Sequence, residues 1–216
     1  MPQSMDFEQL NQSGWAKTYL LVDESTQKAA LIDPVYDYME TYLTAISQRG
    51  LELQYAIATH THADHITACY SLRERTGCEY VMWKDTSCLN VSHYLEDGEI
   101  IMLGSTPLKT HFVPGHTNDH ILIESPTHLF TGDFLFTGQG GVGRDDLPSG
   151  RLLSHWNSLK TLQQLDGNLL VCTGHEAPGT AMQTLDWNRI NNPILNMNSF
   201  EDFEAWQNEV TASLGS

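Results

Sequence analysis

Four side chains that bind transition metals lie within one short stretch of this chain. The stretch reads His60-Thr61-His62-Ala63-Asp64-His65 and directly follows the apolar run 55–58. Imidazole and carboxylate groups together are the ligand set of zinc, iron or manganese rather than of calcium or magnesium. A buried strand that ends in a polar loop holds such ligands on a rigid element and leaves them open to substrate. The stretch therefore predicts a metal site that performs chemistry.

Three further candidate ligands follow other apolar, strand-like runs, each with a glycine directly before it. His116 follows residues 108–113 through Pro114-Gly115, Asp133 follows 128–131 through Gly132, and His175 follows 169–173 through Gly174. Glycine relieves the steric limits on a backbone that must turn tightly beside a bound ion. One such pair is a weak signal, but four strands that each deliver a ligand past their end make a strong one.

These residues must be positioned by the predicted secondary structure, in which several consecutive strands alternate with helices. Residues 17–22 and 28–32 predict a hairpin. Further strands are expected over 55–59, 79–83, 99–103, 108–113, 121–124, 128–131 and 169–172. Helices are expected over 38–49, 66–75, 152–165, 182–190 and 200–210, with Asp64 near the positive N-terminal end of the second. This pattern indicates an α/β (α+β) fold with helices covering sheet faces.

Length and composition limit the number of domains and the classes of binding partner. A chain of 216 residues can bury about 70% of its unfolded surface, so a single domain over 1–216 with a short helical tail from about residue 180 is expected. The net charge of −16 repels nucleic acid and anionic membrane, so neither is an expected partner. No run of about 18 apolar residues and no secretory signal is found. The four cysteines lack C-x-x-C spacing, which favours free thiols and a cytoplasmic location.

The chain resembles the metallo-β-lactamase superfamily over roughly residues 15 to 195. The stretch from His60 to His65, Pro114-Gly115-His116-Thr117, Thr131-Gly132-Asp133 and Gly174-His175 stand in the order typical of that family, and Ile32-Asp33-Pro34 also fits. The resemblance implies a four-layer αββα sandwich of two mixed β-sheets flanked by helices. In dinuclear members, positions matching His60, His62 and His116 hold one metal. Positions matching Asp64, His65 and His175 hold the other, and Asp133 bridges.

The branch of the superfamily that this chain resembles most is the persulfide dioxygenases. Ile66-Thr67 after the ligand stretch and the segment Gly140-Gly141-Val142-Gly143-Arg144-Asp145-Asp146 are similar to elements of that branch, although Asp145 stands where Thr is usual. The resemblance implies that His60, His116 and Asp133 bind one Fe(II), which leaves positions open for O2 and a persulfide. His62, Asp64, His65 and His175 would then orient ligands and water. The expected reaction converts glutathione persulfide and O2 to glutathione and sulfite.

A glyoxalase II-like hydrolase is the alternative. Two metals (zinc, iron or manganese) would generate hydroxide that attacks a glutathione thioester, and all seven ligand positions are filled. Against it, glyoxalase II resembles a two-domain protein, whereas only a short tail follows His175 here. A non-catalytic metal-binding module is a minor third hypothesis.

Weaker expectations concern residues around the site. Arg144 is a candidate contact for substrate carboxylates, with an ion pair to Asp145 or Asp146 as the alternative. Arg189 is a second candidate contact, with a surface role favoured. His120 is expected to brace its loop by hydrogen bonding rather than to bind metal. Tail aromatic residues are expected to pack or to lie at a subunit interface, which leaves a homodimer possible.

Overall fold

The structure is a computed structural model that describes residues 5–11 and 13–214. One sheet contains, in spatial order, β1 (Met5–Gln9), β2 (Tyr19–Asp23), β3 (Lys28–Ile32), β4 (Glu52–Ile57), β5 (Glu79–Trp83) and β6 (His93–Leu95). The other contains β11 (Leu170–Thr173), β10 (His128–Gly132), β9 (Ile121–Glu124), β8 (Thr106–Phe112) and β7 (Ile100–Leu103). Both sheets are mixed, because β3 to β6 pair in parallel in the first and β10 pairs with β11 in parallel in the second.

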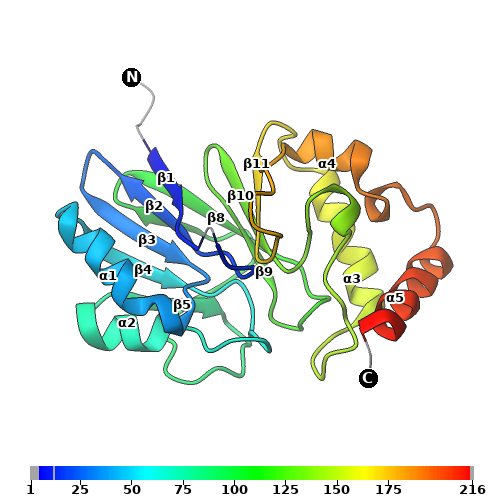
Figure 1. Ribbon diagram of the computed structural model, residues 1–216, viewed down its shortest axis with the longest axis horizontal. Coiled ribbons are helices and arrows are strands. Elements are labelled where there is room, and N and C mark those ends of the chain that lie inside the picture. Colours follow the sequence, from blue (N-terminus) through cyan, green and yellow to red (C-terminus); the bar gives the residue numbers. More distant parts are fainter. Residues whose placement is uncertain (1–4, 12, 215–216) are drawn as a thin grey trace.

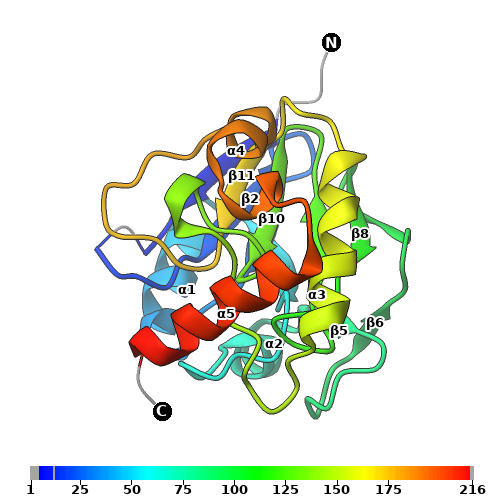
Figure 2. The same cartoon turned by 90° about the vertical axis from the view of Figure 1, so that its right-hand side faces the viewer.

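Helices cover the outer face of each sheet (Figure 1). On the first sheet these are α1 (Met39–Gln48) and α2 (Cys69–Thr76). On the side of the second sheet lie α3 (Leu152–Ser158), α4 (Leu185–Asn191) and α5 (Phe200–Leu214), which face the viewer in Figure 2. Short 3-10 turns complete the chain: η1 (Tyr36–Tyr38), η2 (Gly138–Gly140), η3 (Leu159–Gln163) and η4 (Ile194–Asn196). The predicted αββα sandwich is therefore confirmed.

The period-two alternation of strand side chains creates three apolar layers. In β2, Leu21 points into the core between the sheets and meets residues such as Ile123, whereas Leu20 points outward and packs with Leu72 of α2. A third cluster, which includes Phe203 of α5, lies between the second sheet and its helices. The central strands of each sheet are thus buried on both faces and give the strand ends a rigid support.

The structure departs from the predicted elements in a few places. The edge strands β1 and β6 were not predicted. Helix α2 begins at Cys69 rather than at Ile66, because the Ile66 carbonyl accepts a hydrogen bond from Tyr36 N at 2.8 Å and Thr67 forms a bridge with Val35. The prediction that Asp64 lies near the N-terminal end of this helix is therefore wrong, because Asp64 precedes Cys69 by five positions. None of the helices in residues 5–11 and 13–214 has the length and hydrophobicity of a membrane span.

Candidate metal centre

The candidate ligands lie just past the ends of four strands from both sheets. They are His60 after β4, His116 after β8, Asp133 after β10 and His175 after β11. Two backbone hydrogen bonds tie these ends together: Ile121 N donates to the Thr59 carbonyl at 2.9 Å, and Gly174 N donates to the Gly132 carbonyl at 2.7 Å. The first bond joins the two sheets directly, so ligands that are distant in sequence meet at one edge of the sandwich.

Three of these residues converge on one point. One ligand atom each from His60, His116 and Asp133 lies within 4.8 Å of the other two, and all three residues are buried. The Nε2 atoms of His60 and His116 lie 4.0 and 3.7 Å from Asp133 Oδ2. Two imidazoles and one carboxylate in this arrangement are the donor set of a mononuclear iron site with open positions.

Hydrogen bonds at the other ring nitrogens fix which nitrogen of each histidine can bind a metal. The Thr59 hydroxyl donates to Asp33 Oδ2 at 2.8 Å, so at 2.9 Å from His60 Nδ1 it must accept a proton from that nitrogen. His116 Nδ1 lies 2.5 Å from the Arg144 carbonyl, which can only accept. Both histidines therefore hold their proton at Nδ1, and both Nε2 lone pairs face Asp133.

Burial keeps these two imidazoles neutral, as metal ligation requires. Burial, together with the nearby His62 and His120, holds the pKa of His60 well below its ordinary value. Burial also lowers the pKa of His116, even though Asp133 opposes the shift. The pair needs no deprotonation at neutral pH before it can bind a cation.

The other candidate ligands form a hydrogen-bonded chain beside the triad. His175 Nδ1 lies 2.6 Å from Asp133 Oδ1, His175 Nε2 lies 2.8 Å from Asp64 Oδ2, and His65 Nδ1 lies 2.9 Å from the same Asp64 oxygen. Burial alone would lower the pKa of His175, but the two carboxylates outweigh it and raise the pKa to about 10. His175 is therefore an imidazolium whose nitrogens are both occupied.

His62 has a different partner, Asp33, which stands at a positive φ of 51°. His62 Nε2 lies 3.2 Å from Asp33 Oδ1, and the same oxygen accepts a hydrogen bond from Thr59 N at 2.7 Å. Burial lowers the pKa of His62, but the Asp33 carboxylate reverses the shift and raises it. Asp33 thus holds both His62 and, through Thr59, His60. The sequence Ile32-Asp33-Pro34 does not by itself indicate this role for Asp33.

Several ring nitrogens near the triad lack a partner. In the part of the chain that the structure describes, His62 Nδ1 and His65 Nε2 are buried without a hydrogen bond, as are both ring nitrogens of His120. The prediction that His120 braces its loop by hydrogen bonding is therefore wrong. Its ring instead stacks on His60 at a centroid distance of 4.6 Å, which places it as packing behind the ligand.

The glycines before the ligands are required for two different reasons. Gly132 has a positive φ of 48°, so the predicted role in a tight turn is confirmed there. At Gly174 the reason is close contact, because a Cβ would lie 2.4 Å from Asp133 Oδ1. At Gly115 it would lie 2.5 Å from the His155 side chain.

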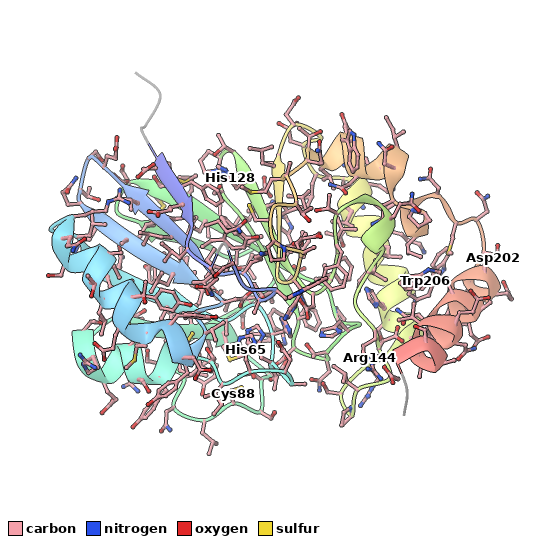
Figure 3. All side chains as sticks on the ribbon, viewed as in Figure 1. His65, Cys88, His128, Arg144, Asp202 and Trp206 are labelled. Atoms are coloured by element: carbon pink, nitrogen blue, oxygen red, sulfur yellow. The ribbon has the colours of Figure 1, made fainter. Side chains whose placement is uncertain are left out.

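A cavity of about 640 Å³ opens beside the triad, a size typical of small-molecule sites. His116, Asp133, Asp64 and His175 line its polar end, and apolar side chains including Phe136, Val142 and Trp206 form much of the rest. Figure 3 shows His65 at the lower edge of the sheets and Arg144 on the loop between that edge and α5.

The two candidate substrate contacts lie in different places. Arg144 lines the cavity, but its guanidinium is paired with Asp146, with Nε 2.5 Å from Asp146 Oδ1. Arg189 is absent from the cavity lining and donates to the carbonyls of Leu162 and Leu165, the latter at 2.7 Å. The structure brings Arg144 to the site, whereas Arg189 joins α4 to η3 and to Leu165 just after it.

The fold and the ligand arrangement agree with the comparisons to known proteins. The chain belongs to the metallo-beta-lactamase superfamily, whose sequence model matches residues 15–175. It is 35% identical over 196 residues to the mitochondrial persulfide dioxygenase ETHE1 of Bos taurus, covering 86% of this chain and 73% of that protein. The crystal structure of ETHE1 from Myxococcus xanthus matches with a TM-score of 0.87 and 33% identity, covering 95% of this chain and 91% of that one.

A hydrolase is also among the relatives. The hydroxyacylglutathione hydrolase GloC of Haemophilus influenzae is 29% identical over 221 residues, covering 90% of this chain and the whole (100%) of GloC. A hydroxyacylglutathione hydrolase can therefore be as short as this chain. The short tail after His175 therefore does not exclude such an activity, and the metal centre must distinguish the two activities.

Proposed function

We propose that this protein is an iron-dependent persulfide dioxygenase that can oxidise glutathione persulfide with O2. The reaction consumes one persulfide, one O2 and one water, and it gives the thiol, sulfite and two protons. The bond between the two sulfurs breaks, the terminal sulfur loses four electrons, and O2 gains them. The similarity to the persulfide dioxygenases ETHE1 supports this activity.

The observation that carries the proposal is the contrast between the triad and His175. Among the described residues, the Nε2 atoms of His60 and His116 have no hydrogen-bond partner and lie 4.0 and 3.7 Å from Asp133 Oδ2, whereas both nitrogens of His175 are hydrogen-bonded to carboxylates. This contrast supports a single ion held by His60, His116 and Asp133. These three residues would hold Fe(II), which would supply electrons to activate O2 and coordination positions open to the reactants.

The surrounding residues then have defined tasks. The Thr59 hydroxyl and the Arg144 carbonyl hold the protons at Nδ1 of His60 and His116. The His175 imidazolium neutralises Asp64 and fixes the second oxygen of Asp133. The apolar side of the cavity excludes bulk water from the reacting sulfur.

A dinuclear, glyoxalase II-like hydrolase of glutathione thioesters is the second candidate. It is favoured by the buried, unpaired His62 Nδ1 and His65 Nε2 among the described residues and by the similarity to GloC. Two zinc ions would then require His62, Asp64, His65 and His175 as ligands.

Metal analysis of anaerobically purified protein, coupled to O2 uptake with glutathione persulfide, tests the proposal. We expect one iron per chain and O2 consumption that matches sulfite release. Two equivalents of zinc, thioester hydrolysis and no O2 uptake would establish the hydrolase instead.

A further inference from the structure

Helix α5, which is far from the candidate metal ligands in the sequence, forms one side of the cavity. Trp206 and Val210 of this helix line the cavity. They are four residues apart, so they stand one above the other on the same helix face. Figure 3 shows Trp206 on α5, on the same side of the molecule as Arg144.

Helix α5 is firmly attached to the segment that carries Arg144. Gln207, which is buried, donates from Nε2 to the Gly143 carbonyl at 2.9 Å. Phe203 is fully buried and packs against the rings of His155 and Trp156, each at 5.5 Å between centroids. The Trp206 indole lies so close to Gly141 that a Cβ there would be 2.6 Å from the ring. The apolar face is therefore a fixed wall of the cavity.

The charges around this wall are unfavourable for carboxylates. The sequence of α5, FEDFEAWQNEVTASL, contains four acidic residues and no Lys, Arg or His. Asp64 and Asp133 also line the cavity. Arg144 is the one Lys or Arg among the described lining residues, and Asp146 already pairs with it. Among the described lining residues, a substrate carboxylate would therefore find no unpaired side-chain cation.

We propose that Trp206 and Val210 select a persulfide whose carbon body is apolar and uncharged over glutathione persulfide. Glutathione carries two carboxylates into a cavity whose lining offers them no free Lys or Arg. An alkyl or aryl body instead removes apolar surface from water against the indole and the valine. This inference rests on the proposed dioxygenase function and names its substrate class.

The first experiment compares benzyl persulfide with glutathione persulfide in steady-state O2 uptake by the iron-loaded protein. We expect kcat/KM to be about tenfold higher for benzyl persulfide, the effect of burying part of one ring. Equal or better use of glutathione persulfide would overturn the selectivity and leave the dioxygenase function standing. Failure of both persulfides to drive O2 uptake would overturn the function instead. Calorimetric titration of metal-free protein with benzyl mercaptan and with glutathione then decides the selectivity alone, since tighter binding of glutathione would refute it.

Two variants that change the net charge equally test whether the wall formed by Trp206 and Val210 causes the substrate selectivity. Val210→Lys places a cation on the wall, and we expect it to raise kcat/KM for glutathione persulfide about fivefold. Glu209→Gln alters the net charge equally but lies on the exposed side of α5, so we expect no more than about a twofold change. Trp206→Ala should lower kcat/KM for benzyl persulfide about tenfold at unchanged iron content. If Val210→Lys behaves like Glu209→Gln, the wall does not select the substrate.

Discussion

Replacement of His175 by Ala separates a mononuclear centre from a dinuclear one. In the mononuclear arrangement His175 touches no metal and acts on Asp133 through Oδ1, while Oδ2 faces His60 and His116. The variant should therefore keep one iron per chain and lose activity only in part. In the dinuclear arrangement the same change removes a ligand, so one of two metals and nearly all turnover should disappear.

The expected loss of iron affinity follows from one hydrogen bond. The bond from His175 Nδ1 to Asp133 spans 2.6 Å, and the His175 side chain is 24% exposed. A charge-assisted hydrogen bond contributes about 1.5 to 3 kcal/mol, and water that replaces the ring puts the loss near the lower end. About 1.5 kcal/mol corresponds to roughly tenfold weaker iron binding, which agrees with the usual effect of residues behind a metal ligand.

The assay measures iron per chain by mass spectrometry, the dissociation constant by chelator competition, and O2 uptake with glutathione persulfide. His93→Ala is the matched control, because His93 also lies between two carboxylates, Glu79 at 2.6 Å and Glu99 at 3.5 Å, away from the site. The control should leave all three measurements unchanged. Two metals per chain in the unaltered protein, falling to one in His175→Ala, would refute the mononuclear assignment.

Three further predictions concern the ligand, its packing and the stability of the fold. Asp133→Ala should abolish iron binding and activity together, and retention of full activity would disprove the triad. In Gly143→Ala the new Cβ would lie 2.1 Å from the Asp133 carbonyl and 2.8 Å from His116 Nδ1, so iron affinity should fall at least about tenfold, measured by chelator competition. Burial alone would raise the pKa of Asp23, but hydrogen bonds from Ser105, Ser25 and Thr26 hold the pKa well below its ordinary value. Asp23→Asn should therefore lower the free energy of unfolding by about 2 kcal/mol at pH 7. Because the folded pKa is lowered, this difference should shrink as the pH falls below about 4, and urea unfolding at several pH values would expose a difference that grows instead.

The convergence of the candidate ligands was predictable because local sequence encodes it. Each of His60, His116, Asp133 and His175 follows a short apolar strand, and strand ends in a layered sheet meet at one edge. The strand pattern does not indicate which ring nitrogen of each histidine is free to bind a metal. That depends on partners distant in sequence, such as the Arg144 carbonyl on His116 Nδ1 and Asp33 on His62.

Other features depend on tertiary contacts that periodicity does not encode. Strand β1 has intermediate or exposed side chains, and β6 spans only His93–Leu95, so neither gives the apolar signal of a central strand. The position of α5 over the cavity likewise depends on Gln207 reaching the Gly143 carbonyl. Its amphipathic pattern predicts a helix and a buried face, but not which surface that face covers.

The number of bound metals should also depend on pH, because the candidate ligands differ in whether they carry a proton that a metal must displace. His60 and His116 have lowered pKa values, so binding at the triad releases no proton from them near neutral pH. A second ion must displace the proton of His175, whose pKa is raised to about 10, at a cost of about 4 kcal/mol at pH 7. The apparent affinity for a second ion should therefore rise about tenfold per pH unit between 7 and 9 while the first stays nearly constant. Zinc titrations at these pH values, followed by calorimetry in buffers of different ionisation enthalpy, measure both the affinities and the protons released. Two ions that bind with the same pH dependence would show that His175 is not protonated between the two carboxylates, and the contrast on which the mononuclear proposal depends would be lost.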